Sequence, residues 1–308
     1  MIPFGERTIF FLAFFCAIAV FSASGQTPQD GGVKGKVLAK APSMPSLKKL
    51  QALHEPFPSP QPGDWQYEQK ESGQTFAQYK SGKPTVVTAK RSVIYVQTLG
   101  NMTDSQKKIV AKTTDYLGLF FGLKTKTLPD LDASVVPISA RRIHPMGMRQ
   151  FNATYICQKV LIPRLPSDAA AYIAFTAEDL FPDPSWSFCF GYAMYQQRVG
   201  VWSIARNGNP DDSEEAVQVL RRTLRIASHE TGHMFSMLHC IAYKCNMNGV
   251  NSMEQADKTP LYLCPECLRK LKMATKADYI KRWRLLEAFY CENGLEPEAA
   301  FIKKCLGE

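Results

Sequence analysis

Three of the chain's five histidines fall within one short segment, which reads His229-Glu230-Thr231-Gly232-His233 and continues to His239. A helix places residues i and i+4 on one face, so His229 and His233 would present both imidazoles to one metal ion. Glu230 can face the open position of that metal without binding it. At ~100° per residue, His239 is turned away from this face, so the chain must leave the helix before His239 and fold back.

Three protein ligands and one open position are the features of a catalytic zinc site. Zinc would activate a water molecule, and Glu230 would act as general base while the water attacks a peptide carbonyl. We therefore expect hydrolysis of a peptide or protein substrate. The alternative is an ordinary amphipathic helix with unrelated histidines, which leaves the third histidine unexplained.

A second cluster of possible metal ligands begins directly after His239, with cysteines in the pattern C-x4-C-x18-C-x2-C. Paired cysteines at short spacing are typical of closed, structural zinc sites. Zinc there would pin the loop that carries His239, so we predict two zinc ions per chain, one catalytic and one structural. The alternative is two disulfides, although a bridge across a C-x2-C pair would be strained. The four cysteines are Cys240, Cys245, Cys264 and Cys267; the pairing of Cys157, Cys189, Cys291 and Cys305 stays open.

Residues 1–25 have the layout of a secretory signal peptide, in which Arg7 precedes an apolar run and then small residues. The sequence therefore predicts a secreted or periplasmic protein, with a short N-terminal anchor as the alternative. No later stretch reaches ~20 apolar residues, so no membrane span is expected after cleavage.

The net charge of +9 is not gathered into a basic run, which argues against a nucleic-acid partner. We expect a monomer.

The remaining chain divides into a Pro/Gly-rich N-terminal extension at 26–90 and a catalytic domain at 91–308 that includes the four-cysteine site. Residues 26–63 of the extension are interpreted as a surface tail or clamp of open role. Thr103 and Gln106 form a capping box for a helix that Gly122 can end. Asp212 or Ser213 would begin the long helix that carries the metal motif. Strands alternating with helices indicate an α/β or α+β domain with a mixed sheet packed on helices. Strands are expected at 92–97, 135–138, 170–176, 186–193 and 199–205, and later helices at about 276–292 and 296–306; the lone His54 and His144 are taken as structural.

The combined pattern resembles the archaemetzincins, metzincin-type zinc peptidases that pair a three-histidine site with an adjoining four-cysteine zinc site. The resemblance implies a zincin-like fold, in which the active-site helix is followed by a zinc-pinned C-terminal subdomain. It also implies that Met247 is the methionine of the Met-turn beneath the histidines, and that the activity is aminopeptidase-like. The matching segments are His229-Glu230-x-x-His233-x-x-Ser236-x-x-His239-Cys240, Cys245-Asn246-Met247 and Leu263-Cys264-Pro265-Glu266-Cys267-Leu268.

One residue departs from the family pattern, because Ser236 stands where the family has glycine. That glycine lets the chain turn out of the helix with φ > 0, which costs another residue ~1–2 kcal/mol. Ser236 could therefore loosen His239, and the second function to consider is a catalytically impaired, zinc-stabilised binding module. The presence of Glu230 favours the enzyme, since a binding module needs no base.

Overall fold

The computed structural model describes residues 45–308, so the predicted signal peptide and the first part of the N-terminal extension lie outside the described residues. Among the described helices, none has the length and apolar character needed to cross a membrane. The α-helices are α1 (Leu47–Leu53), α2 (Trp65–Gln69), α3 (Phe76–Ser81), α4 (Asp104–Phe121), α5 (Ala153–Tyr155), α6 (Ala216–Met234), α7 (Met253–Asp257), α8 (Pro265–Thr275), α9 (Tyr279–Glu292) and α10 (Glu296–Leu306). The strands are β1 (Val93–Leu99), β2 (Lys124–Thr127), β3 (Arg141–Ile143), β4 (Arg149–Asn152), β5 (Ala169–Thr176), β6 (Asp179–Phe181), β7 (Gly191–Met194) and β8 (Val199–Ser203).

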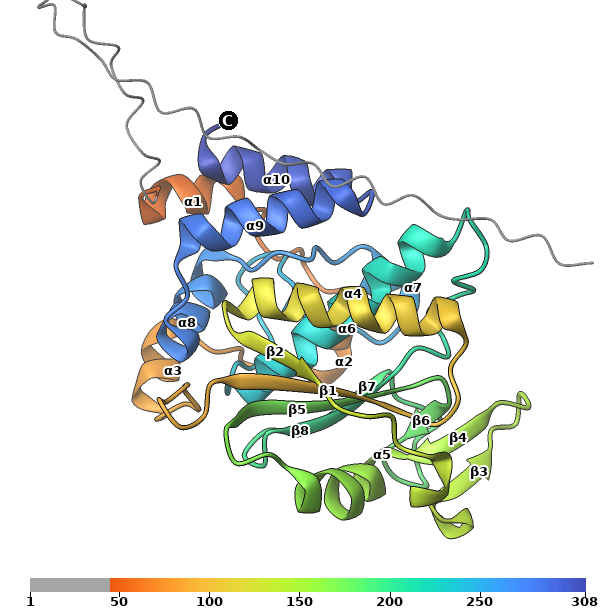
Figure 1. The fold of residues 1–308 in the computed structure, drawn as a ribbon. Helices are drawn as coiled ribbons and strands as arrows, with labels where there is room; N and C mark the ends of the chain where they lie inside the picture. Colours follow the sequence, from red (N-terminus) through yellow and green to blue (C-terminus); the bar gives the residue numbers. More distant parts are fainter. Residues whose placement is uncertain (1–44) are drawn as a thin grey trace, which may run out of the picture. The chain divides into compact units, whose positions relative to one another are not determined.

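The main sheet has five strands in the order β2-β1-β5-β8-β7. The first four are parallel and the edge strand β7 is antiparallel to β8, which confirms the predicted mixed sheet. A smaller sheet, β3-β4-β6, lies to one side (Figure 1). Strand β7 therefore offers a free sheet edge next to α6.

Both faces of the main sheet are covered, so its central strands are buried throughout. Alternate residues of β1 enter two different cores, because successive side chains of a strand point to opposite faces. Ile94 and Val96 pack toward α4 and α6, whereas Val93 and Tyr95 pack toward a π-helical turn at Ile156–Leu161. Continuous apolar strands of this kind are typical of parallel sheets with two covered faces.

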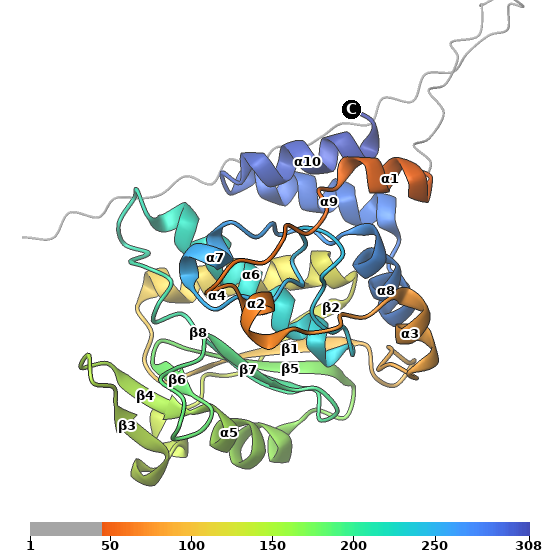
Figure 2. The ribbon, with the colours of Figure 1, turned by 180° about the vertical axis from the view of Figure 1, so that it is seen from behind.

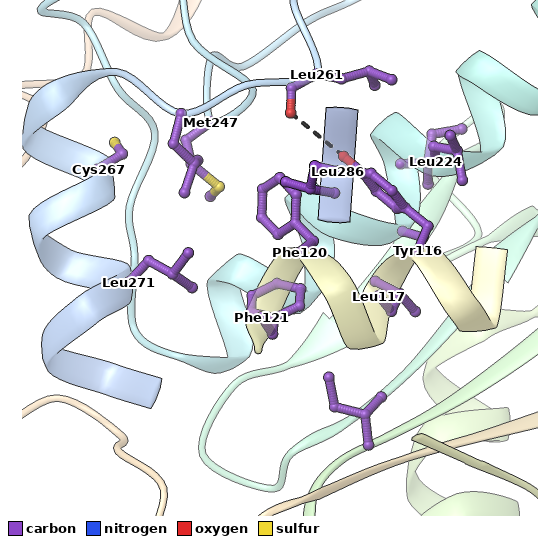
Figure 3. Close-up of a cluster of buried hydrophobic side chains, with 14 of the residues drawn as sticks. Tyr116, Leu117, Phe120, Phe121, Leu224, Met247, Leu261, Cys267, Leu271 and Leu286 are labelled. Atoms are coloured by element: carbon purple, nitrogen blue, oxygen red, sulfur yellow. Dashed lines mark hydrogen bonds between the residues drawn. The ribbon is translucent and has the colours of Figure 1, made fainter. Parts of the chain in front are cut away.

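Helices α4 and α6 lie over one face of the sheet, and α9 and α10 stack beyond them (Figure 1). Tyr116, Phe120 and Phe121 of α4 fill the space between these layers (Figure 3). The predicted capping box of α4 is present, and Gly122 ends the helix with φ 65°. This layer holds α6, the helix with the histidines, in place.

Three expectations about local structure are wrong. Residues 135–138 form no strand; 3₁₀ turns flank Pro137, which has no N–H to donate to a sheet. The strand expected at 186–193 is present only from Gly191, and the aromatic residues before it form a loop. Helix α6 begins at Ala216 rather than beside Asp212 or Ser213, and no side chain caps its first turn.

The described part of the N-terminal extension forms α1, α2 and α3, which lie against the rest of the molecule (Figure 2). His54 is buried there, with its ring nitrogens 2.8 Å from Leu50 O and 3.2 Å from Leu263 O. The described residues, 45–308, belong to one compact unit. His144 is also buried and contacts the Ser187 hydroxyl. Both lone histidines thus have structural contacts.

Candidate active site

Helix α6 and the loop after it bring the three predicted histidines together. His229 and His233 lie one turn apart on the helix, and their Nε2 atoms are 3.1 Å apart. The ring of His239 lies 5.2 Å from that of His229 and 4.9 Å from that of His233. One nitrogen of each ring lies within 4.8 Å of the others, which is close enough for one metal ion. The sequence prediction that His239 folds back to the helix is confirmed.

The other ring nitrogen of each histidine faces an acceptor. Nδ1 of His229 lies 2.8 Å from the Asn246 carbonyl, and Nδ1 of His233 lies 2.6 Å from the Met237 carbonyl. A carbonyl can only accept, so each Nδ1 carries the proton and each Nε2 keeps a free lone pair. Burial lowers the pKa of His233 to about 3, which keeps this ring neutral. Neutral imidazoles oriented in this way are the ligands that zinc requires, so the donor set fits the metal.

The third histidine is oriented by a carboxylate from the N-terminal extension. Nδ1 of His239 lies 2.8 and 3.0 Å from the two carboxylate oxygens of Glu71. The ring of Trp65 packs edge-on against His239, with the ring centres 5.2 Å apart. A carboxylate behind a zinc-binding histidine fixes its tautomer and makes it a stronger ligand. Residues 65–71 therefore complete the surroundings of the site.

The chain leaves α6 through a left-handed turn at Ser236, whose φ is 63°. Its N–H donates to His233 O at 2.8 Å, and the N–H of Met237 donates to Gly232 O at 3.2 Å. These two bonds define a Schellman motif, in which glycine is the usual residue at the left-handed position. The Ser236 hydroxyl accepts a hydrogen bond from Thr85 N at 3.0 Å, which a glycine could not do. Serine thus adopts the turn expected of the family glycine and gains a contact there.

The N-terminal extension also holds the loop between Phe235 and His239. The side chain of Gln74 donates to Ser236 O and accepts from Leu238 N, both at 3.2 Å. The hydroxyl of Tyr79 donates to Phe235 O at 2.7 Å. These bonds fix the backbone that leads from the active-site helix to the third histidine.

Glu230 lies at the surface of the cleft beside the histidines and is partly exposed. Among residues 45–308 its carboxylate has no hydrogen-bond or ion-pair partner, so it is free to contact a bound molecule. Its surroundings raise its pKa to about 7, because the charged form is poorly solvated there, while the Arg225 guanidinium acts in the opposite direction. A carboxylate with this pKa can take up and release a proton near neutral pH.

Met247 lies beneath α6 and is fully buried. A Cβ atom built on Gly232 would come within 2.6 Å of the Met247 sulfur, so the helix and the methionine are in close contact. The carbonyl of Met247 accepts a hydrogen bond from Cys240 N at 2.8 Å. Met247 thus supports the helix and connects it to the cysteine loop, in the place expected for the methionine of a Met-turn.

The four predicted cysteine ligands also come together. All four are buried, their sulfur atoms lie within 4.8 Å of one another, and none forms a disulfide. Backbone N–H groups point at the sulfurs of Cys245 and Cys264, at 3.3 to 3.5 Å. Such N–H groups stabilise thiolates, so this quartet fits a closed zinc site rather than a disulfide pair. Cys157, Cys189, Cys291 and Cys305 are also unpaired.

A cleft of about 840 Å³ opens over the histidines and Glu230. The loop before β7 forms one wall with Trp186 and Phe188, and the chain from Val250 to Ala256 forms another. Trp65 and Glu71 line it as well. The free edge of β7 and the open mouth of the cleft leave room for an extended chain.

Sequence reasoning missed several residues of this cleft, among them Glu71 and Arg225. Glu71 lies 168 positions from His239, so no local pattern connects them. Arg225 lies four residues before His229, and helical spacing alone could have indicated that it shares the face of the histidines.

Comparisons with known proteins give the family of this chain. The peptidase family M54 model matches residues 169–273, which include all seven predicted metal ligands. Archaemetzincin-2 of Pongo abelii is 32% identical over 258 residues, which cover 73% of this chain and 71% of that protein. Archaemetzincin-1 of Homo sapiens is 29% identical and matches 54% of this chain and 39% of its own. The solved archaemetzincin of Methanopyrus kandleri aligns with a TM-score of 0.48 at 22% identity, covering 62% of this chain and 99% of that one. By its identity to archaemetzincin-2 over more than two thirds of both chains, this protein belongs to the archaemetzincin family and is a zinc metallopeptidase.

Proposed function

We propose that this peptidase cleaves peptide bonds with Glu230 as general base, and that His229, His233 and His239 hold its catalytic zinc. The observation that carries the proposal is the convergence of three oriented imidazoles on one point beside an unpartnered carboxylate. Zinc, when bound, supplies Lewis acidity. The cysteine quartet would hold a second, structural zinc ion, giving two per chain.

The chain's own groups account for the proton transfers. The Glu230 carboxylate accepts a proton from the attacking water and passes it to the leaving amine. A pKa near 7 suits both halves of this exchange, since the group must be basic first and acidic afterwards. The cleft walls bind and orient the peptide beside this carboxylate.

Two observations favour an enzyme over the impaired binding module. The hydrogen bond from Thr85 N to the Ser236 hydroxyl offsets part of the cost of the left-handed turn. Glu71 and Gln74 hold the loop that carries His239 through bonds that do not involve the Ser236 side chain. A loosened third ligand is therefore not expected.

The test combines metal content with activity in the full mature chain. We expect two zinc ions in the wild type, one in His239→Ala, and loss of about 10³-fold or more of kcat in Glu230→Gln, as for removal of a general base. Glu68→Gln, on α2 outside the base and ligand set, is the matched control. One zinc in both the wild type and His239→Ala would show that only the cysteine site binds zinc, and would favour the binding module.

The exact mode of cleavage and the location are also proposals. Aminopeptidase action predicts that acetylation of the substrate N-terminus abolishes cleavage, whereas an endopeptidase would cut the blocked peptide equally well.

Export predicts that the mature chain isolated outside the cytoplasm begins near residue 26, and a chain that still starts at Met1 would contradict it. A monomer predicts a mass near 32 kDa by light scattering (about 25 residues less than the 34.5 kDa of the full chain).

A further inference from the structure

A buried arginine lines the active-site cleft without a carboxylate partner. Arg225 lies on α6 one turn before His229, and only 3% of its surface is exposed. Its side chain is part of the cleft wall, together with Ile226 and Glu230. The two preceding arginines face elsewhere, and each has its own carboxylate: Arg221 pairs with Glu298 and Arg222 pairs with Asp257.

The hydrogen-bonding capacity of Arg225 is largely unused. A guanidinium has five N–H donors, but only Nη2 has an acceptor in the described chain, the Asn248 carbonyl at 2.9 Å. Nε is fully buried with no acceptor. No carboxylate of residues 45–308 lies within 4 Å of the group. Buried polar groups in native proteins are nearly always paired, so an exception of this kind needs an explanation.

The position of Arg225 suggests the missing partner. Burial lowers its pKa to about 10, so the group remains a cation at neutral pH. Apolar side chains line the same cleft, among them Ile226, Val250, Met253 and Ala256. A cleft that combines apolar walls with a buried cation fits a short aliphatic chain that terminates in a carboxylate.

The position of Arg225 relative to the scissile bond follows from the helix. Arg225 and Glu230 stand five residues apart on α6, so at ~100° per residue their side chains leave the helix on the two sides of His229. The Nη2 of Arg225 donates to the Asn248 carbonyl, next to Gly249, whose backbone lies against Trp65. A carboxylate bound by Arg225 therefore belongs to a residue close to the scissile bond, one helical turn from His229.

We propose that Arg225 forms an anion-binding subsite that selects substrates with a carboxylate on a residue next to the scissile bond. This inference rests on the proposed function and adds a substrate class to it. The carboxylate can come from a Glu or Asp side chain or from the C-terminus of the substrate. A charge-assisted, bidentate pair in a desolvated pocket should favour the carboxylate over its amide by about 10- to 100-fold in kcat/KM.

The first measurement uses the wild type alone. Cleavage of a mixed peptide library is mapped by mass spectrometry, and matched peptides are then made that differ only in the residue before the cut or only in the residue after it. Glu, Gln and Lys are compared at each position in peptides with amidated ends. A further pair ends directly at the residue after the cut, as a free acid or as an amide, which separates the two carboxylate sources. A preference for the acid in either comparison supports the subsite, and equal rates in both overturn it.

The second measurement tests the residue. Arg225→Met keeps the apolar length and removes the charge, and it should reduce the Glu-over-Gln ratio to about one, while Arg225→Lys should keep part of it. Arg149→Met is the control, because it removes an exposed arginine outside the cleft and should leave the ratio unchanged. An unchanged ratio in Arg225→Met would overturn the proposal.

The third measurement does not depend on turnover. Calorimetry compares binding of Glu-Leu-Ala-amide and Gln-Leu-Ala-amide, which mimic the released product, to the zinc-loaded full chain. Tighter binding of the Glu peptide by the wild type, and its loss in Arg225→Met, would establish the subsite. This result would hold even if no peptide were cleaved, and only the proposed peptidase mechanism would then fail. Cleavage without any Glu preference, together with equal binding, would overturn the subsite alone.

Discussion

The carboxylate of Glu71 accepts a hydrogen bond from Nδ1 of His239 at 2.8 Å, so the N-terminal extension supplies the orienting partner of the third histidine. Partners of this kind typically change metal affinity by about 10- to 100-fold. We expect Glu71→Gln to weaken binding at the histidine site by about that factor. Zinc transfer to a calibrated chelator measures the affinity.

The control for this prediction is Glu68→Gln, because Glu68 lies three residues before Glu71, on α2, and its carboxylate accepts from Gly63 N rather than from a histidine. Equal zinc affinity in Glu71→Gln and Glu68→Gln would show that the carboxylate behind His239 is dispensable.

Ser236 combines an unfavourable backbone angle with a favourable side-chain contact. In Ser236→Ala the left-handed φ stays and the bond from Thr85 N is lost, so the free energy of unfolding should fall by about 1 kcal/mol. In Ser236→Gly the same bond is lost, but the relief of ~1 kcal/mol of backbone strain should restore stability to near the wild type. Urea unfolding measures both, and an alanine variant as stable as the wild type would mean that the hydroxyl contributes nothing.

The cysteine quartet should be required for the shape of the histidine site as well as for its own metal. Cys240 directly follows His239, and its N–H donates to Met247 O. We expect Cys264→Ser to lose the structural zinc, to lower the melting temperature and to reduce occupancy at the histidines. Zinc content and thermal unfolding test this. Cys291→Ser is the matched control, since Cys291 is exposed and outside the quartet, and it should retain two zinc ions.

Gly249 allows Trp65 to pack close to the backbone behind the site. A Cβ atom at this position would come within 2.4 Å of the Trp65 ring. Gly249→Ala should therefore displace the indole from His239 and cost about 1–3 kcal/mol of stability, as overpacking does. Tryptophan fluorescence and chemical unfolding would detect both effects. Gly82→Ala, where the nearest atom is 3.3 Å away, should change stability much less.

The sequence was most informative where the chemistry is local. The spacing of His229, His233 and His239 predicted the metal-binding cluster and the exit from the helix, because both follow from helical geometry. The capping box at Thr103 and the glycine at 122 likewise predicted both ends of α4, since each end depends on residues only a few positions apart.

Features that depend on distant residues could not be predicted in this way. The residues before β7 alternate as in a strand, but Trp186 and Phe188 line the cleft, and Cys189 bridges to Leu180 instead of to β8. The stretch around Pro137 is apolar enough for a strand, yet its backbone closes into two 3₁₀ turns. The positions of Glu71 and Gln74 depend on the packing of the N-terminal extension against the loop after α6, which no periodicity encodes.

The long separation between Glu71 and His239 also has a consequence for biosynthesis. A ribosome synthesises the N-terminus first, so Glu71 emerges 168 residues before its partner. At ~5–20 residues per second, the interval is about 10 to 30 s. During that interval the nascent chain contains the orienting carboxylate but no complete histidine cluster. The proposed catalytic cluster is therefore incomplete until His239 has been made, and an unfinished chain that ends before it lacks the third zinc ligand.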